Sequence, residues 1–245
     1  TTTTTTSVVK DPQTRSRLMK VSDPQTYSAL SYAPPTKDEK KLPLLLVLHG
    51  AGKNDGDAWS LADPQGEHRG LAPSLLASGN APPVLADNFA VVTPYSAGKP
   101  SFYGEPREKL LRFVKWVCSD EGRKAGCAEV DPKRIFILGF SDGATLGLEL
   151  ATTRRFAGCV LCSNGFTGDL PELAKTKLKD LPVWVFHCAD DAIFPVKCGD
   201  KLVAALKSVS SRDVVRYTRY DQDQEGFTGS VRGHSTGITA SRQPE

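Results

Sequence analysis

Residues 134–143 read RIFILGFSDG, an apolar run followed directly by a serine between two glycines. The apolar run predicts a strand that is buried on both faces, and the residues after Gly143 predict a helix. Gly139, Ser141 and Gly143 thus fill the pattern G-x-S-x-G at a strand-to-helix turn, where such a serine acts as a nucleophile. The alternative is a glycine-rich turn whose serine caps the helix.

Strand and helix patterns alternate outward from this turn along most of the chain. Strands are expected at 27–32, 44–48, 89–93, 134–138, 156–162, 183–186 and 214–217, and helices at 70–76, 107–118, 143–152 and 196–209. This alternation predicts the α/β class, with a mostly parallel central sheet covered by helices on both faces. Ligands of such sheets bind beyond the carboxyl ends of the strands, so residues that follow strands are the first candidates for a site.

The segment HGAG at 49–52 follows one of these strands. Its glycines allow the backbone to approach a substrate closely, and a free N–H group there can face a developing oxyanion. The expected donors are the backbone N–H groups of Ala51 and Asp142, the latter being the residue after the serine. His49 could also act as a base, but we favour a structural role because it lies at the end of the strand.

A triad with Ser141 needs a carboxylate and an imidazole from later in the chain. Asp190 and Asp191 follow the strand at 183–186, where a carboxylate can orient a histidine. The spacing does not separate the two, and both could be solvated turn residues. His234 is the only histidine after them, and the order serine, aspartate, histidine fits this kind of triad.

Composition excludes several classes of function. The chain has 31 Lys+Arg and 28 Asp+Glu residues, a formal charge of +3, and no long basic block, which argues against nucleic-acid binding. The longest apolar run, residues 42–48, is too short to span a membrane. Six cysteines permit disulfides but require none, and free thiols are the favoured interpretation.

The chain is expected to have two parts. Residues 1–24 are polar and begin with six threonines, which predicts a flexible, low-complexity arm. Residues 25–245 are expected to form a single domain. No initiator Met is present, so we expect a processed or truncated start; a cytoplasmic location is slightly favoured and a secreted one stays open.

The chain resembles the α/β-hydrolase superfamily from about Tyr27 to His234. Within it the chain is most similar to the phospholipase/carboxylesterase group and the neighbouring predicted-peptidase and feruloyl-type esterases. The segments that carry the resemblance are LLLVLHGAG at 44–52, DPKRI at 131–135 leading into GFSDG at 139–143, and FHCADDAIFP at 186–195. The group's acid segment reads H-G-x-x-D-x-x-V-P, and placing His187 and Pro195 on it puts the acid at Asp191.

The resemblance implies the α/β-hydrolase fold and a serine hydrolase of carboxylic esters that works through an acyl-enzyme. It implies Ser141 as nucleophile, His234 as base and Asp191 as acid, with no cofactor and no metal. Phe166 and Phe194 are expected to line the substrate pocket. The expected partner is a small-molecule ester or thioester, with no nucleic acid and no membrane span, and the oligomeric state is open.

Two other functions stay open. An acyl-protein or lipid thioesterase would use the same triad on a different substrate. A non-catalytic, hydrolase-like binding protein is the third possibility, because Asp142 stands where the group often has Gln, Met or Ala. A carboxylate beside an oxyanion hole opposes a negative transition state unless it points away or is paired, although the helix dipole favours it there.

Overall fold

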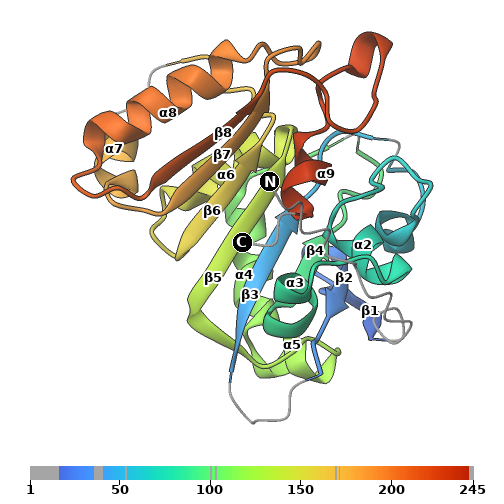
Figure 1. Ribbon diagram of the computed structural model, residues 1–245. Coiled ribbons are helices and arrows are strands. Elements are labelled where there is room, and N and C mark those ends of the chain that lie inside the picture. The colour runs from blue at the N-terminus through green and yellow to red at the C-terminus, as the bar shows by residue number, and fades with distance from the viewer. Residues whose placement is uncertain are drawn as a thin grey trace.

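The structure is a computed structural model that describes residues 17–35, 41–52, 54–99, 101–102, 104–168, 170 and 172–242, with side chains from 174 in the last range (Figure 1). An eight-stranded sheet with the order β1-β2-β4-β3-β5-β6-β7-β8 forms its centre. The strands are β1 (Leu18–Ser22), β2 (Ser28–Tyr32), β3 (Leu42–Leu48), β4 (Ala90–Pro94), β5 (Val130–Phe140), β6 (Gly158–Cys162), β7 (Val183–Cys188) and β8 (Val215–Tyr220). The pairs β1–β2 and β2–β4 are antiparallel and the other pairs are parallel, which confirms the predicted α/β class.

Helices cover both faces of the sheet. They are α2 (Ala72–Ser78), α3 (Pro83–Asn88), α4 (Arg107–Val117), α5 (Asp120–Lys124), α6 (Asp142–Ala151), α7 (Glu172–Leu178), α8 (Lys197–Val209) and α9 (Thr236–Ser241), with 3-10 turns η1 (Ala58–Ala62) and η2 (Gly229–Val231). One apolar core lies between the sheet and helices α4, α6 and α8, and a second lies between the sheet and η1, α2 and α3.

Strand β3 shows why its apolar run has no polar alternation. Leu44, Leu46 and Leu48 belong to the first core, whereas Leu45 and Val47 belong to the second. Successive side chains of a strand point to opposite faces, so a strand covered on both sides needs apolar residues at every position. The same argument explains the predicted strand that leads into Ser141.

The expected arm is wrong at its carboxyl end, because part of it is strand β1. Residues 18–22 pair antiparallel with β2, and Leu18 and Val21 are buried in the two cores. Only these two positions are apolar and buried, so the segment has the weak pattern of an edge strand. The rest of the expected arm, residues 1–16, lies outside the described residues. All six cysteines are free thiols.

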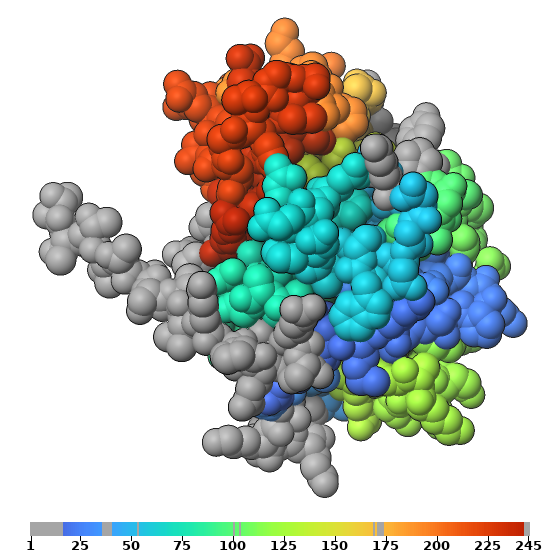
Figure 2. Space-filling view, turned by 90° about the vertical axis from the view of Figure 1, so that its right-hand side faces the viewer, coloured from blue at the N-terminus to red at the C-terminus, as the bar shows by residue number. Residues whose placement is uncertain are grey.

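The carboxyl-terminal segment returns to the middle of the molecule. In Figure 1, α9 lies across the carboxyl ends of the central strands. In Figure 2 the orange-to-red segment lies directly beside the cyan segment that follows β3. These segments and the turns after β5 and β7 therefore meet at one end of the sheet, as expected for a ligand site in this class.

Candidate active site

Ser141 occupies a strained turn between β5 and α6. Its backbone has φ 56° and ψ −124°, and positive φ is uncommon for residues other than glycine. The amide of Ser141 donates a 2.9 Å hydrogen bond to the carbonyl of Cys162 at the end of β6. Strain of this kind persists where the surroundings enforce it, and it concentrates at functional positions.

The two glycines of the pentapeptide allow this turn to pack. A Cβ atom at Gly139 would lie 2.5 Å from the carbonyl oxygen of Gly143, and one at Gly143 would lie 2.2 Å from that of Leu48. Helix α6 therefore approaches β3 and β5 more closely than any side chain would permit. This close approach places Ser141 above the carboxyl end of the sheet.

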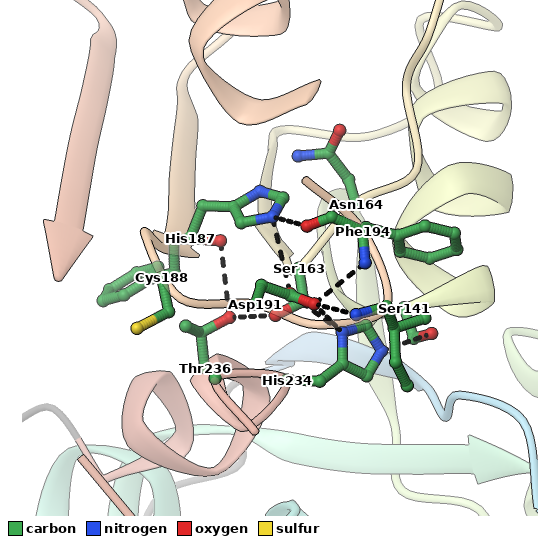
Figure 3. Close-up of polar contacts among 12 residues, drawn as sticks. Ser141, Ser163, Asn164, His187, Cys188, Asp191, Phe194, His234 and Thr236 are labelled. Atoms are coloured by element: carbon green, nitrogen blue, oxygen red, sulfur yellow. Dashed lines mark hydrogen bonds and ion pairs between the residues drawn. The ribbon is translucent and has the colours of Figure 1, made fainter. Parts of the chain in front are cut away.

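His234 lies between Ser141 and Asp191 (Figure 3). Its Nδ1 atom is 2.9 Å from Oδ2 of Asp191, and its Nε2 atom is 2.9 Å from Oγ of Ser141. An ionised carboxylate can only accept hydrogen bonds, so Nδ1 carries a proton and donates a hydrogen bond to Asp191. In the neutral ring, Nε2 is then left as the acceptor for the hydroxyl of Ser141.

Asp191 is held as an anion in the turn after β7. Its Oδ1 accepts the backbone amides of Ile193 and Phe194 at 2.9 and 2.8 Å, and Nε2 of His187 lies 3.5 Å from Oδ2. Burial alone would raise the pKa of Asp191. Hydrogen bonds from His187 and His234 outweigh burial and hold this pKa well below its usual range.

Asp190 faces a different part of the molecule. Its Oδ1 accepts a 2.9 Å hydrogen bond from Sγ of Cys188, and its Oδ2 lies 3.6 Å from Nε of Arg232. The structure therefore brings Asp191, and not Asp190, to His234.

The HGAG turn packs directly against Ser141. A Cβ atom at Gly50 would lie 2.9 Å from Cβ of Ser141, and Ala51 and Asp142 both line the cavity that contains Ser141. Asp142 is the first residue of α6, so its amide has no acceptor inside the helix. Its side chain is half-buried.

His49 and His68 form a buried group beneath the HGAG turn. Their rings lie 4.5 Å apart, and Nε2 of His49 accepts the amide of Ser96 at 3.3 Å. Nε2 of His68 donates to Oδ1 of Asn54 at 3.0 Å. Burial lowers the pKa of His49 to about 3 and also lowers the pKa of His68. Both rings are therefore neutral near pH 7, which fits the structural role expected for His49.

A cavity of about 590 Å³ opens onto Ser141 and His234. Its other lining residues are mostly apolar: Ala51, Gly52, Glu67, Arg69, Leu71, Phe140, Asp142, Ile193, Phe194, Phe227, Val231 and Ile238. Phe194, one of the two expected pocket residues, lines this cavity, and its ring is 5.5 Å from that of His234.

Phe166 is not among the residues that line this cavity, so its expected position is wrong. It lines a separate cavity of about 570 Å³ with residues of α6 and α7. The reason is the path of the chain after β6: a Cβ atom at Gly165 would lie 3.0 Å from the ring of Phe194. Gly165 thus packs tightly against Phe194, whereas the side chain of Phe166 packs against the first apolar core.

Several cavity residues were missed by sequence reasoning because they lie in a polar, glycine-rich tail. Phe227, Val231 and Ile238 flank His234 along the chain and line the same cavity. They form no periodic pattern, so their closeness in sequence to the expected base was the only signal.

The described part of the chain bears on two further kinds of function, metal binding and membrane insertion. Within that part of the chain, no group of three or more His, Cys, Asp or Glu side chains is arranged to hold a metal ion. None of its helices combines the length and apolar character needed to cross a bilayer.

Comparisons with known proteins agree with this architecture. Residues 116–225, which include Ser141 and Asp191, match the family described as Phospholipase/Carboxylesterase. No curated protein sequence matches the chain.

Solved structures give the wider match. A thermostable esterase is 22% identical with a TM-score of 0.61; 92% of this chain is covered, and the chain spans only 60% of the esterase. An α/β-hydrolase enzyme from a Medee basin deep-sea metagenome library is 19% identical over 84% of this chain and 81% of its own, with a TM-score of 0.55. A fungal esterase from Rhizomucor miehei is 18% identical, with a TM-score of 0.56; the match covers 90% of this chain and 76% of the esterase. The chain therefore adopts the α/β-hydrolase fold.

Proposed function

We propose that this protein is a serine hydrolase that cleaves carboxylic esters through Ser141, His234 and Asp191. The observation that carries the proposal is the pair of 2.9 Å contacts on the two nitrogens of His234. Asp191 accepts a hydrogen bond from the Nδ1–H group of His234 and thereby leaves Nε2, the basic nitrogen, facing the hydroxyl of Ser141. A serine is a weak nucleophile without such a base beside it.

The reaction runs in two halves. Oγ of Ser141 attacks the ester carbonyl while Nε2 of His234 takes the hydroxyl proton, and the same proton then passes to the departing alcohol. The acyl group stays on Ser141 until water, deprotonated by His234, attacks the acyl carbon and releases the carboxylic acid. Asp191 remains ionised and stabilises the imidazolium that forms in each half.

The tetrahedral intermediates need donors for their oxyanion. We assign this role to the backbone amides of Ala51 and Asp142, which belong to residues that line the cavity beside Ser141. Two such donors contribute a large share of catalysis in acyl transfer, because they act where charge develops. The carboxylate of Asp142 works against this effect, and we expect it to lower the rate.

The walls of the cavity favour an apolar substrate. Phe140, Phe194 and Phe227 supply aromatic surface next to the reacting serine, which suits an acyl or alcohol group with little charge. The comparisons support an ester substrate, since two of the similar structures are named as esterases. A thioester would react by the same steps.

Hydrolysis of p-nitrophenyl acetate tests the proposal. Ser141→Ala should lower kcat by at least about 10³-fold without changing the melting temperature, because no nucleophile remains. Full activity in that variant would overturn the proposal. Oxygen esters and thioesters with the same acyl chains, compared by kcat/KM, then separate a carboxylesterase from a thioesterase, and a folded protein that hydrolyses neither would be a binding protein.

A further inference from the structure

His234 lies in a long loop between strand β8 and the short helix α9. The loop leaves β8 at Tyr220, passes through η2 and returns to α9 at Thr236. Most residues at the tip of the loop, 228–232, are exposed. The tip is tied to the turn after β7 by a 2.8 Å hydrogen bond from the amide of Ala192 to the carbonyl of Arg232. Further contacts near the two ends of the loop fix the residues next to His234.

Asp223 joins the outgoing and returning parts of this loop. Its Oδ1 accepts the backbone amides of Glu225 and Phe227 at 2.7 and 3.0 Å. Its Oδ2 accepts the amide of Gly233 and the hydroxyl of Ser235, both at 2.9 Å. One half-buried carboxylate thus fixes the two residues on either side of His234.

The charge of Asp223 matters for this arrangement. Burial alone would raise the pKa of Asp223, but the hydrogen bonds from Ser235 and from three backbone amides lower it. The carboxylate is therefore ionised near neutral pH and can accept from all four donors. A neutral amide in its place has one acceptor oxygen and presents an NH₂ group to two of the donors.

The returning part of the loop has little room to move toward Asp191. Gly233 has φ 71°, and a Cβ atom there would lie 2.5 Å from the amide nitrogen of Asp191. Thr236, just beyond His234, is anchored by a 2.7 Å hydrogen bond between its Oγ1 and Oγ of Ser163. Asp223 supplies the matching anchor on the loop side.

We propose that Asp223 is a positioning residue that holds His234 within reach of Ser141 and Asp191. This inference rests on the proposed function, because Asp223 acts only through His234, whose role as the base is part of that proposal. Asp223 itself has no contact with the substrate. A displacement of a catalytic group by about 1 Å can cost about a hundredfold in rate. The role of Asp223 should therefore appear in kcat and leave KM nearly unchanged.

The first test compares Asp223→Asn with Asp221→Asn, measured on p-nitrophenyl acetate. Asp223→Asn should lower kcat by about tenfold to a hundredfold. Asp221 starts the same loop with a side chain that is 96% exposed, so Asp221→Asn removes the same charge and should leave kcat unchanged. Equal kcat values for the two variants would overturn the inference. Ser235→Ala, which removes one of the four hydrogen bonds, should give a smaller loss of the same kind and serves if Asp223→Asn does not fold.

A double-mutant cycle separates positioning from a general structural effect. In a His234→Ala background, Asp223→Asn should change the residual rate by less than about twofold, because the group it positions is gone. The cycle with Ser235→Ala should give the same result. A loss as large as in the native background would mean that Asp223 does not act through His234. If His234→Ala itself kept full activity, the proposed function would fail. If His234→Ala lost activity but Asp223→Asn kept the native kcat, the proposed function would stand and only the role of Asp223 would be rejected.

Discussion

Asp190 and Asp191 are neighbours in the sequence, but their carboxylates have different surroundings. Asp191 accepts the two backbone amides of its own turn and the Nδ1 proton of His234. Asp190 contacts Cys188 and Arg232 instead. Only one of the two can decide which nitrogen of His234 is basic.

This difference predicts unequal effects of the same substitution. Asp191→Asn should lower kcat by roughly 10³- to 10⁴-fold, because an amide can donate to Nδ1 and so stabilise the wrong tautomer of His234. Asp190→Asn should keep kcat close to that of the native protein. Steady-state kinetics on p-nitrophenyl acetate measure both, and equal modest losses would contradict the assignment of the acid.

Individual residues were predictable from the sequence where a motif fixes their position. The G-x-S-x-G pattern identified Ser141, and the resemblance of the segment from His187 to Pro195 selected Asp191 where spacing alone could not. Phe166 was misplaced because no local pattern encodes how the chain packs after β6, where Gly165 contacts Phe194 and Phe166 lies against the first core.

At the scale of elements, the contact between α6 and β3 sets the height of Ser141 above the sheet. Gly143 lies over the carbonyl of Leu48, and Gly147, one turn later in α6, lies over the side chains of Ile137 and Leu161. A backbone carbonyl cannot move without disturbing the strand, whereas side chains can adjust.

The two glycines should therefore respond differently to alanine. Gly143→Ala should lower the free energy of unfolding by at least about 2 kcal/mol, because the new methyl group overlaps backbone. Gly147→Ala should change it by less than about 1 kcal/mol, since the higher helix propensity of alanine offsets the tighter packing. Urea unfolding measures both, and a Gly143→Ala protein as stable as the native one would contradict the close packing of α6.

The buried strands were predictable because short, continuous apolar runs such as 44–48 are typical of strands that are covered on both faces. Strand β1 was missed because only Leu18 and Val21 are buried. Helix α9 was missed because its sequence, TGITAS, contains few strong helix formers. Gly237 packs against the ring of Phe140, so this helix depends on tertiary contacts.

At the scale of the whole molecule, a buried carboxylate joins the segment before β2 to the segment that leads into α4. Glu105 accepts hydrogen bonds from Tyr27 at 3.0 Å, from Lys109 at 2.9 Å, and from Lys99. Burial alone would raise the pKa of Glu105, but these three donors lower it to about 2 from an ordinary value of 4.5. A lowered pKa means that the folded protein favours the ionised form.

Stability should therefore depend on pH through Glu105. Its contribution is complete above pH 4.5 and is lost as the pH falls toward 2. Glu105→Gln should be less stable than the native protein by roughly 1–3 kcal/mol at pH 7. This difference should shrink between pH 4.5 and 2, because the native carboxyl becomes protonated there. Denaturant unfolding at pH 7 and pH 3 measures it, and a constant difference would contradict the role of the charge.

The fold as a whole brings Ser141, Asp191 and His234 together from three turns at one end of the sheet, and this arrangement should make Ser141 a nucleophile. Reaction of the folded protein with a fluorophosphonate, followed by mass spectrometry of the peptides, measures this directly. We expect one adduct, on Ser141, that is absent in Ser141→Ala and forms far more slowly in His234→Ala. An unlabelled Ser141, or labelling at the same rate without His234, would mean that Ser141 is not a nucleophile activated by His234.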